Sequence, residues 1–361
     1  MSRDAAAARA VLRHAKRVVV KVGSSALARD GEAYARLASE IAHLRRSGKK
    51  VVLVSSGAIA LGTKKLGYRA RPKEIARLQA AAAAGQSLLM RAYEEAFATK
   101  KIPVAQVLLT HADLADRVRA NNARAALAAL LDAGAVPILN ENDSVAVEEI
   151  KFGDNDELSA MVTPLVDADT LVLLSDVEGL LDARGNVVRA VADVATEAAP
   201  LVQKKKSEAG TGGMASKVEA ARRATLAGAN VVIADARREN VLSRIFDGGL
   251  EGTLFLASSR HLSAKKHWIA FTLRPRGDVW VDEGAAVAVR TNGKSVLAVG
   301  VRGVRGDFGR GDSVRIVAPD GTEIGRGLAR IAASEALLVA GTRDDDEARA
   351  VLVHRDDLVV W

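Results

Sequence analysis

The sequence contains no cysteine, and few of its residues are aromatic. The lack of cysteine excludes disulfide bonds, thiolate-bound zinc, iron–sulfur clusters and a thiol nucleophile. It is compatible with a reducing compartment, and we expect a cytoplasmic protein. Aromatic residues make up 3% of the chain, so a stacking platform for single-stranded nucleic acid is not favoured.

Long apolar runs are also missing. No run approaches the roughly 18 residues that a bilayer-spanning helix needs, so we expect no membrane segment. The stretch from Ala5 to Arg17 is rich in alanine and arginine, which is superficially like a transit peptide. Because Asp4 precedes it and an apolar strand pattern follows at once, we interpret residues 1–16 as an N-terminal tail or short helix.

Several signatures of known chemistry are incomplete. The six histidines form no zinc-type pair, and the sequence has no G-x-S-x-G elbow. Gly293-Lys294-Ser295 imitates the end of a P-loop, but Ala288 stands where that motif needs its first glycine. These patterns therefore give no support to a zinc enzyme, a serine hydrolase or a P-loop ATPase.

Charge is unevenly distributed along the 361 residues. The whole chain has 52 basic and 44 acidic residues, a net charge of +8. From Pro275 to Trp361 there are 12 basic and 14 acidic residues, or −2, which leaves 40 and 30, or +10, for the part before. A basic balance suits nucleic acid and small polyanions such as ATP equally well.

The first 250 residues alternate short apolar runs with longer stretches of helical character. The apolar runs are Val18–Val22, Val51–Val54, Val104–Leu109, Val136–Leu139, Leu171–Leu174 and Val231–Ala234. The helical stretches are residues 34–44, 74–98, 114–133 and 214–228. This alternation predicts an α/β fold, a three-layer αβα sandwich with a mostly parallel central sheet that is covered on both faces.

The pattern changes after about Arg274. The last 87 residues contain 12 glycines, whereas the first 274 contain 18. Short valine-rich runs recur there, among them 285–289, 296–301 and 336–339, which predicts a small all-β barrel or sandwich. We therefore expect a catalytic domain over residues 17–262, a linker over 263–275 and a β domain over 276–361.

Small and polar residues follow four of the predicted strands. They are Gly23-Ser24-Ser25, Ser55-Ser56-Gly57, Asn140-Glu141-Asn142-Asp143 and Ser175-Asp176. Ligands bind beyond the carboxyl ends of strands in open α/β sheets, so this edge is the predicted site. Each turn alone is also explained by ordinary turn chemistry.

Two features suggest anion binding. Thr211-Gly212-Gly213-Met214-Ala215-Ser216-Lys217 places adjacent glycines before a predicted helix, whose N-terminal dipole and backbone N–H groups suit a phosphate. Lys21 lies inside an apolar strand, where a cation is costly unless it is paired or belongs to a site. The alternatives are a flexible loop with a solvated Lys217 and a strand-end Lys21 that reaches solvent.

A third cluster consists of Asn140-Glu141-Asn142-Asp143 and Gly153-Asp154-Asn155-Asp156. Alone it could be a hydrophilic loop or a weak metal site, although its spacing does not fit an EF-hand.

Five parts of the sequence together resemble the glutamate 5-kinases of the amino-acid kinase family in their order and spacing. They are Val-Lys21-Val-Gly-Ser-Ser, Val-Ser-Ser56-Gly-Ala-Ile-Ala, the third cluster, Leu-Ser175-Asp176 and Gly-Thr-Gly-Gly-Met-Ala-Ser-Lys217. Val281–Ala285, Asp307–Gly311 and His354–Asp357 resemble the C-terminal PUA domain of the long form of that family.

The resemblance implies the amino-acid kinase fold and transfer of a phosphoryl group from ATP, with Mg²⁺, to the γ-carboxylate of L-glutamate, the first step of proline biosynthesis. Lys21, Lys217 and Asp156 would be catalytic, with Asp156 holding the two lysines. The implied ATP-binding residues are Lys21, Gly23, Ser175, Asp176, Thr211, Gly212, Gly213, Met214, Ala215, Ser216 and Lys217. The implied glutamate-binding residues are Ser56, Asp143 and Asn155, and no protein metal ligand is implied because Mg²⁺ would arrive on ATP.

The resemblance also implies a homo-oligomer, feedback inhibition by L-proline and channelling to glutamyl-phosphate reductase. One departure is Leu181, where the family commonly has tyrosine, so the adenine side is less well specified. Another carboxylate kinase of the same family is one alternative function. An RNA-binding protein acting through the PUA domain is the other, and the −2 balance and few aromatics of that domain argue against it.

Overall fold

The computed structural model describes residues 2–27, 32–146, 155–203, 213–342 and 351–361. The chain forms two compact units, Met1–His261 and Leu262–Trp361. Each unit has its own hydrophobic core, and they are described separately below. Within the described residues, no helix combines the length and the apolar character that a bilayer span requires.

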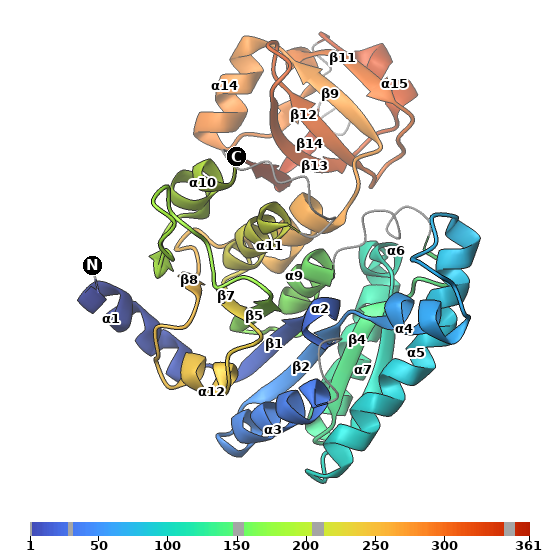
Figure 1. Cartoon of the computed structure of the whole chain (residues 1–361). Coiled ribbons are helices and arrows are strands. Elements are labelled where there is room, and N and C mark those ends of the chain that lie inside the picture. Colours follow the sequence, from blue (N-terminus) through green and yellow to red (C-terminus); the bar gives the residue numbers. More distant parts are fainter. Residues whose placement is uncertain (1, 28–31, 147–154, 204–212, 343–350) are drawn as a thin grey trace. The chain divides into compact units, whose positions relative to one another are not determined.

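One sheet forms the centre of the first unit (Figure 1). In its described part the strand order is β3-β4-β2-β1-β5-β7-β8-β6. The strands are β1 (Arg17–Val22), β2 (Lys50–Ser55), β3 (Val104–Leu109), β4 (Val136–Glu141), β5 (Thr170–Ser175), β6 (Ala190–Val191), β7 (Asn230–Asp235) and β8 (Thr253–Phe255). Neighbours pair in parallel except β7 and β8, which are antiparallel, so the predicted mostly parallel sheet is confirmed.

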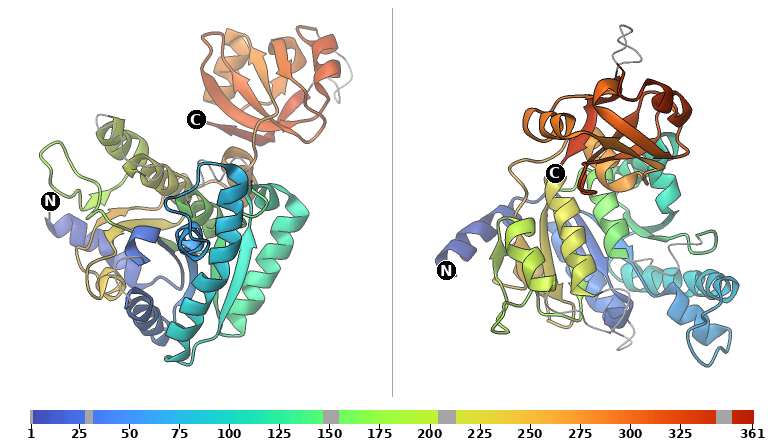
Figure 2. Two further views of the ribbon diagram at one scale, coloured as in Figure 1. Left: turned by 45° about the vertical axis from the view of Figure 1, so that its right-hand side comes forward. Right: turned by 90° about the horizontal axis from the view of Figure 1, so that it is seen from above.

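Helices cover both faces of this sheet (Figure 2). On one face, apolar side chains from α1 (Ser2–Arg13), α3 (Ala33–Arg46), α5 (Ile75–Ala98) and α12 (Val241–Phe246) join a single core cluster. The opposite cluster includes side chains of α6 (His111–Ala115), α7 (Arg117–Asp132), α9 (Asn155–Leu165) and α11 (Met214–Leu226). The predicted three-layer sandwich is therefore confirmed.

Strand β1 shows why a continuous valine run serves this architecture. Val18 and Val20 lie in one core cluster and Val19 lies in the other, because successive side chains of a strand point to opposite faces. Burial on both faces requires apolar residues at successive positions. The register places Lys21 between Val54 of β2 and Leu173 of β5, so this lysine lies in the middle of the sheet.

Two short helices follow β1 and β2, namely α2 (Ser24–Leu27) and α4 (Ala58–Lys65). Helix α4 packs closely against α5 through glycine. A Cβ atom on Gly62 would lie 1.7 Å from the Ala81 carbonyl oxygen, and one on Gly85 would lie 1.8 Å from that of Ala58. Only glycine permits this approach, which fixes α5 beside the end of β2.

The N-terminal residues form α1, which packs on the first unit. Leu12 is fully buried, and Arg9 is also fully buried. The Arg9 guanidinium donates to four backbone carbonyls, those of Arg189, Gly249, Glu251 and Gly252. Of the two interpretations that the composition left open, a helix is correct. The remaining elements in the described residues of this unit are π-helix η1 (Val194–Ala198) and α10 (Ala199–Gln203).

The second unit contains a curled sheet with the order β10-β14-β13-β12-β9-β11 in its described residues (Figure 2). Its strands are β9 (Gly277–Val281), β10 (Val296–Leu297), β11 (Val301–Gly306), β12 (Ser313–Val317), β13 (Glu323–Ala329) and β14 (Val351–Val360). A 3₁₀-helix, η3 (Ala298–Gly300), joins β10 to β11. This sheet confirms the expected β barrel.

Two of the predicted strands in this unit are wrong. Residues 285–289 lie in helix α14 (Glu283–Asn292), and residues 336–339 lie in helix α15 (Ala333–Val339). A side-chain oxygen of Asp282 accepts a hydrogen bond from the Ala285 N–H and caps α14. Short apolar runs cannot distinguish a strand from a buried helical turn, and alanine favours the helix in both segments.

The residues expected to form a linker also have regular structure. They contain α13 (Ala264–His267) and π-helix η2 (Trp268–Thr272), which belong to the second compact unit. Ile269, Ala270 and Phe271 are buried, and Arg326 donates to the Ala270 carbonyl oxygen at 3.0 Å. Buried apolar residues at successive positions are the reason that this segment packs onto the unit.

Candidate active site

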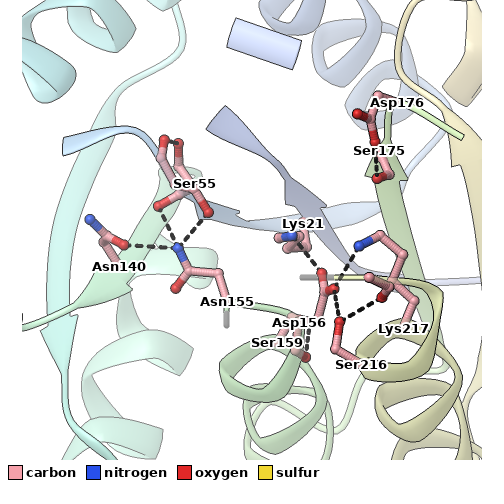
Figure 3. Close-up of polar contacts among 12 residues, drawn as sticks. Lys21, Ser55, Asn140, Asn155, Asp156, Ser159, Ser175, Asp176, Ser216 and Lys217 are labelled. Atoms are coloured by element: carbon pink, nitrogen blue, oxygen red, sulfur yellow. Dashed lines mark hydrogen bonds and ion pairs between the residues drawn. The ribbon is translucent and has the colours of Figure 1, made fainter. Parts of the chain in front are cut away.

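The predicted site residues that the structure describes lie around one edge of the sheet. Strands β4, β2, β1 and β5 are neighbours and parallel, so their carboxyl ends meet at that edge. The four polar segments that follow these strands in the sequence therefore lie around one region. Helix α9 supplies Asn155 and Asp156 to it, and helix α11 supplies Lys217 (Figure 3).

A buried carboxylate joins the two lysines. Asp156 is fully buried, and its Oδ1 lies 2.5 Å from Lys21 Nζ. Its Oδ2 lies 3.0 Å from Lys217 Nζ (Figure 3). Both lysines are 5% exposed, so these ion pairs lie away from bulk water. Lys21 thus does not reach solvent as a strand-end lysine would, and Lys217 is not a solvated residue.

The two lysines keep the shared carboxyl group ionised. Burial acts to raise the pKa of Asp156, but the nearby Lys21 and Lys217 ammonium groups outweigh it and hold this pKa below its usual value. Asp156 is therefore ionised, and it holds both ammonium groups at this edge of the sheet. Two ammonium groups fixed in one place suit a negatively charged ligand.

The local helix geometry sets this arrangement. Asn155 and Asp156 open α9, where the positive end of the helix dipole stabilises a carboxylate. Gly213 is the N-cap of α11, and Ser216 Oγ bridges its carbonyl oxygen and Asp156 Oδ2 at 2.9 and 3.1 Å. Lys217 follows in the first turns. Met214 is half-buried and Ala215 is exposed, while Thr211 and Gly212 lie outside the described residues.

An ion-pair cluster further along connects the same two helices. Arg223 of α11 pairs with Glu157 of α9, and its Nε donates to Glu219 at 2.8 Å. Glu157 directly follows Asp156 in the chain. This cluster therefore helps to keep Asp156 and Lys217 in register.

The end of β5 and the turn after β1 border the triad. Ser175 is buried and donates through Oγ to Oδ1 of the exposed Asp176 at 3.1 Å. The N–H of Gly23 donates to the Leu174 carbonyl oxygen at 3.3 Å, which ties this turn to β5. A Cβ on Gly23 would lie 4.0 Å from Lys21 Nζ, so glycine keeps the space beside that ammonium group open.

Hydrogen bonds hold Asn155 near the end of β2, which lies on the opposite side of β1 from β5. Its Nδ2 donates to Ser56 Oγ at 2.8 Å, to Asn140 Oδ1 at 3.0 Å and to the Ser55 carbonyl oxygen at 3.2 Å (Figure 3). Asn140 Nδ2 in turn donates to Gln86 Oε1 at 2.9 Å. The structure thus brings two of the three expected glutamate-binding residues, Ser56 and Asn155, into direct contact.

The third, Asp143, lies in the turn after β4 and is half-buried. Burial raises its pKa to about 6, and the charge of Arg71 opposes this rise. Among the described residues, no hydrogen bond or ion pair joins Asp143 to Ser56, Asn155 or Lys21. A carboxylate that is poorly stabilised in this way gains most from a cationic partner.

The sequence analysis missed several residues that shape this site. Gln86 is buried within an alanine-rich stretch of α5, and its amide is the one polar break in that apolar face that could have drawn attention. Tyr93, about two helical turns further along, contacts Ser55 Oγ through its hydroxyl group at 2.7 Å. The Arg223 pairing and the contact between Tyr93 and Ser55 have no signal in the sequence, because each depends on the packing of separate elements.

Comparisons with known proteins agree with this geometry. Residues 16–235 match the model of the amino acid kinase family, and residues 277–351 match that of the PUA domain. A glutamate 5-kinase of Cupriavidus pinatubonensis is 47% identical, with 97% of this chain and 99% of the relative covered. A glutamate 5-kinase of Trichlorobacter lovleyi is 46% identical, with 98% of each chain covered.

Among solved structures, N-acetylglutamate synthase of Neisseria gonorrhoeae in complex with coenzyme A and L-arginine has a similar fold. Its TM-score is 0.52 at 19% identity, with 71% of this chain and 64% of that chain covered. This likeness concerns the fold alone. The family models and the near full-length relatives show that the chain belongs to the amino acid kinase family, among the glutamate 5-kinases with a PUA domain.

Proposed function

We propose that the chain transfers the γ-phosphoryl group of ATP to the γ-carboxylate of L-glutamate and forms L-glutamyl 5-phosphate, the first step of proline biosynthesis. The named relatives support the reaction. The observation that carries the proposal is the buried triad of Lys21, Asp156 and Lys217, which fixes two ammonium groups at the carboxyl edge of the sheet.

The reaction needs no general base. A carboxylate is already ionised at neutral pH, so one of its oxygens attacks the γ-phosphorus directly. The bond from that phosphorus to the oxygen bridging it to the β-phosphate breaks, and ADP leaves with the electron pair. The difficulty is to bring an anion to a polyanion, which positioning and positive charge overcome.

The two lysines have separate places in this scheme. Lys21 extends from the central strand beside the space that Gly23 leaves open, and Lys217 approaches from the first turns of α11. Both are fixed by Asp156, so their ammonium groups are oriented before the substrates bind. A fixed cation stabilises the charge that develops on the transferring group, and reorientation during the reaction is not needed.

Magnesium fits the site as a companion of ATP. Both carboxylate oxygens of Asp156 already face lysine ammonium groups, which makes this residue an anchor for the lysines instead of a metal ligand. Mg²⁺ would neutralise part of the phosphate charge when it is bound. The described residues Gly23, Ser175, Asp176, Gly213 and Ser216 would line the nucleotide side.

On the acceptor side, Asp143, Ser56 and Asn155 would bind the α-ammonium and α-carboxylate groups of L-glutamate. The α-ammonium group would pair with Asp143, whose pKa is raised to about 6 by burial and which gains a cationic partner on binding. We also propose that the chain acts as a cytoplasmic homo-oligomer that L-proline inhibits and that passes its unstable product to glutamyl-phosphate reductase. We do not propose RNA binding for the PUA domain.

Release of ADP with L-glutamate as acceptor tests this function. Purified protein with ATP and Mg²⁺ should release ADP only when L-glutamate is added, and L-proline should reduce the rate. Aspartate, N-acetyl-L-glutamate and carbamate as acceptors separate the other carboxylate kinases of the family. Turnover of one of these without turnover of L-glutamate would overturn the proposal.

A further inference from the structure

A second buried carboxylate holds a cation at the carboxyl edge of the sheet, outside the triad. Asp235, the last residue of β7, is 7% exposed. Its Oδ1 accepts from Arg237 Nε at 2.7 Å and from the Arg237 N–H at 2.9 Å, and its Oδ2 accepts from Arg237 Nη2 at 2.6 Å. A bidentate pair of this kind fixes the plane of the guanidinium group. Because the Arg237 side chain is still 46% exposed, it presents a rigid planar group to solvent.

This pair lies on the nucleotide side of the triad. Strand β7 is next to β5, and β5 is next to β1, so the end of β7 lies two strands, or about 10 Å, from the end of β1. The Ala236 N–H donates to the Ser175 carbonyl oxygen at 2.7 Å and joins the loop of Arg237 to the end of β5. Figure 3 shows Ser175 on the opposite side of Lys21 from Asn155. A nucleotide whose γ-phosphate reaches the triad would therefore extend towards Arg237 with its other end.

The charges around Arg237 favour the base of that nucleotide over its phosphates. The hydrogen bonds and the charge of Asp235 raise the pKa of Arg237, and the charges of Asp176 and Glu178 add to this effect. A phosphate that approached the guanidinium group would meet these carboxylates as well. The two faces of the guanidinium plane take no part in the hydrogen bonds, because its N–H groups lie in the plane. Such a face stacks on nucleobases.

The neighbouring loops supply no aromatic ring for this purpose. Residues 176–189, which follow β5, and residues 236–240, which follow β7, contain no aromatic residue. Proteins bind bases on aromatic rings or on arginine planes. We infer that the guanidinium plane of Arg237 stacks on the adenine ring of ATP, and that Asp235 is a positioning residue that fixes this plane. The inference rests on the proposed function.

Arg238, the next residue, is placed differently and serves as the matched control. It lines a small cavity with Val22, Leu174 and Val241, which belong to the core cluster on the α3 face of the sheet. Its Nη2 lies 3.5 Å from Glu178 Oε1, and both of these side chains are at least half exposed. This long contact does not fix the guanidinium plane, although the charge and the loop are the same as those of Arg237.

Ribose 5-triphosphate separates the base from the rest of the nucleotide, because it keeps the ribose and phosphates of ATP but lacks adenine. ATP and ribose 5-triphosphate, each with Mg²⁺, are titrated calorimetrically into wild-type protein, Arg237→Lys and Arg238→Lys. Arg237→Lys keeps a cation beside Asp235, so the buried carboxylate is not left alone, but it removes the plane. Stacking of a guanidinium group on an aromatic ring strengthens binding by roughly 3- to 30-fold.

We expect Arg237→Lys to weaken ATP binding by that factor and to leave the binding of ribose 5-triphosphate unchanged. Arg238→Lys should change neither. Equal weakening of both ligands in Arg237→Lys would indicate a contact to phosphate or ribose and would overturn the inference. Unchanged ATP binding in Arg237→Lys, or an equal loss in Arg238→Lys, would also overturn it. Wild-type protein that binds ATP but does not phosphorylate L-glutamate would instead refute the proposed function, so the two failures are distinguishable.

Asp235→Asn tests the positioning role. This variant keeps the size of the side chain and one oxygen for the Arg237 N–H groups, but it removes the charge that holds the guanidinium plane. We expect the preference for ATP over ribose 5-triphosphate to fall towards that of Arg237→Lys. A merely structural role would lower the stability of the protein and leave this preference as it is in the wild type, and that result would contradict the positioning role.

Discussion

Removal of the Lys217 ammonium group should affect catalysis more than ATP binding. Lys217→Met keeps much of the aliphatic side chain but removes one of the two ammonium groups that Asp156 holds. The remaining carboxylate keeps one partner at 2.5 Å, so the buried anion is not left alone and the fold should persist.

The expected magnitude follows from the burial of this group. Lys217 is 5% exposed, so the ammonium group acts where water screens it little. Negative charge shifts onto the bridging and equatorial oxygens during transfer, and a fixed cation stabilises that state more than bound ATP. Loss of one such contact costs on the order of 3–4 kcal/mol, which corresponds to a fall in kcat of about 10²–10³.

Steady-state kinetics and calorimetric titration with ATP measure the two effects separately. Lys217→Met should lose kcat by that factor while the ATP dissociation constant changes only modestly, and Lys217→Arg should recover little because a planar guanidinium does not replace a compact ammonium. Lys64→Met is the matched control, since it removes the ammonium group of an exposed lysine outside the site. Near-normal kcat in Lys217→Met would refute the reasoning.

Three further predictions concern substrate binding, modularity and packing. Asp143→Asn should raise the glutamate KM strongly and the ATP KM little. In the wild type, kcat/KM for glutamate should rise with pH to a plateau above about 6, because the Asp143 carboxyl ionises there, and the variant should lack that rise. Persistence of the rise in the variant would exclude Asp143 as its source. A chain ending at His261 should fold and still phosphorylate glutamate, because all described site residues lie in the first unit; a folded truncation without turnover would contradict this division. Gly85→Ala should lower the free energy of unfolding in urea by about 1–3 kcal/mol or more, because the new Cβ would meet the Ala58 carbonyl oxygen. Ala83→Ser, at an exposed position of the same helix, should change it by less than about 0.5 kcal/mol. Equal effects would argue against the close approach of α4 and α5.

The sequence was sufficient to predict the first unit because its signals are local. Runs such as Val18–Val22 are buried on both faces and need no distant partner to be identified as strands. The location of the site follows from the same logic, since the polar residues after parallel strands must share an edge. Lys21 stood out because a lysine in such a run is costly without a partner.

The errors and omissions arise where tertiary packing decides. Residues 285–289 are apolar enough for a strand, but the cap from Asp282 and the alanines make them a helix. The roles of Gln86 and Asn140 depend on hydrogen bonds between α5, β4 and α9, which no local pattern specifies.

Trapping of the product with hydroxylamine tests the central claim most directly. Acyl phosphates react with hydroxylamine to give hydroxamates, so wild-type protein with ATP, Mg²⁺ and L-glutamate should form γ-glutamyl hydroxamate in proportion to the ADP released. Asp156→Asn, which leaves both buried lysines without their shared carboxylate, should form little of it. ADP release without hydroxamate, or full hydroxamate formation by Asp156→Asn, would contradict carboxylate phosphorylation at this triad.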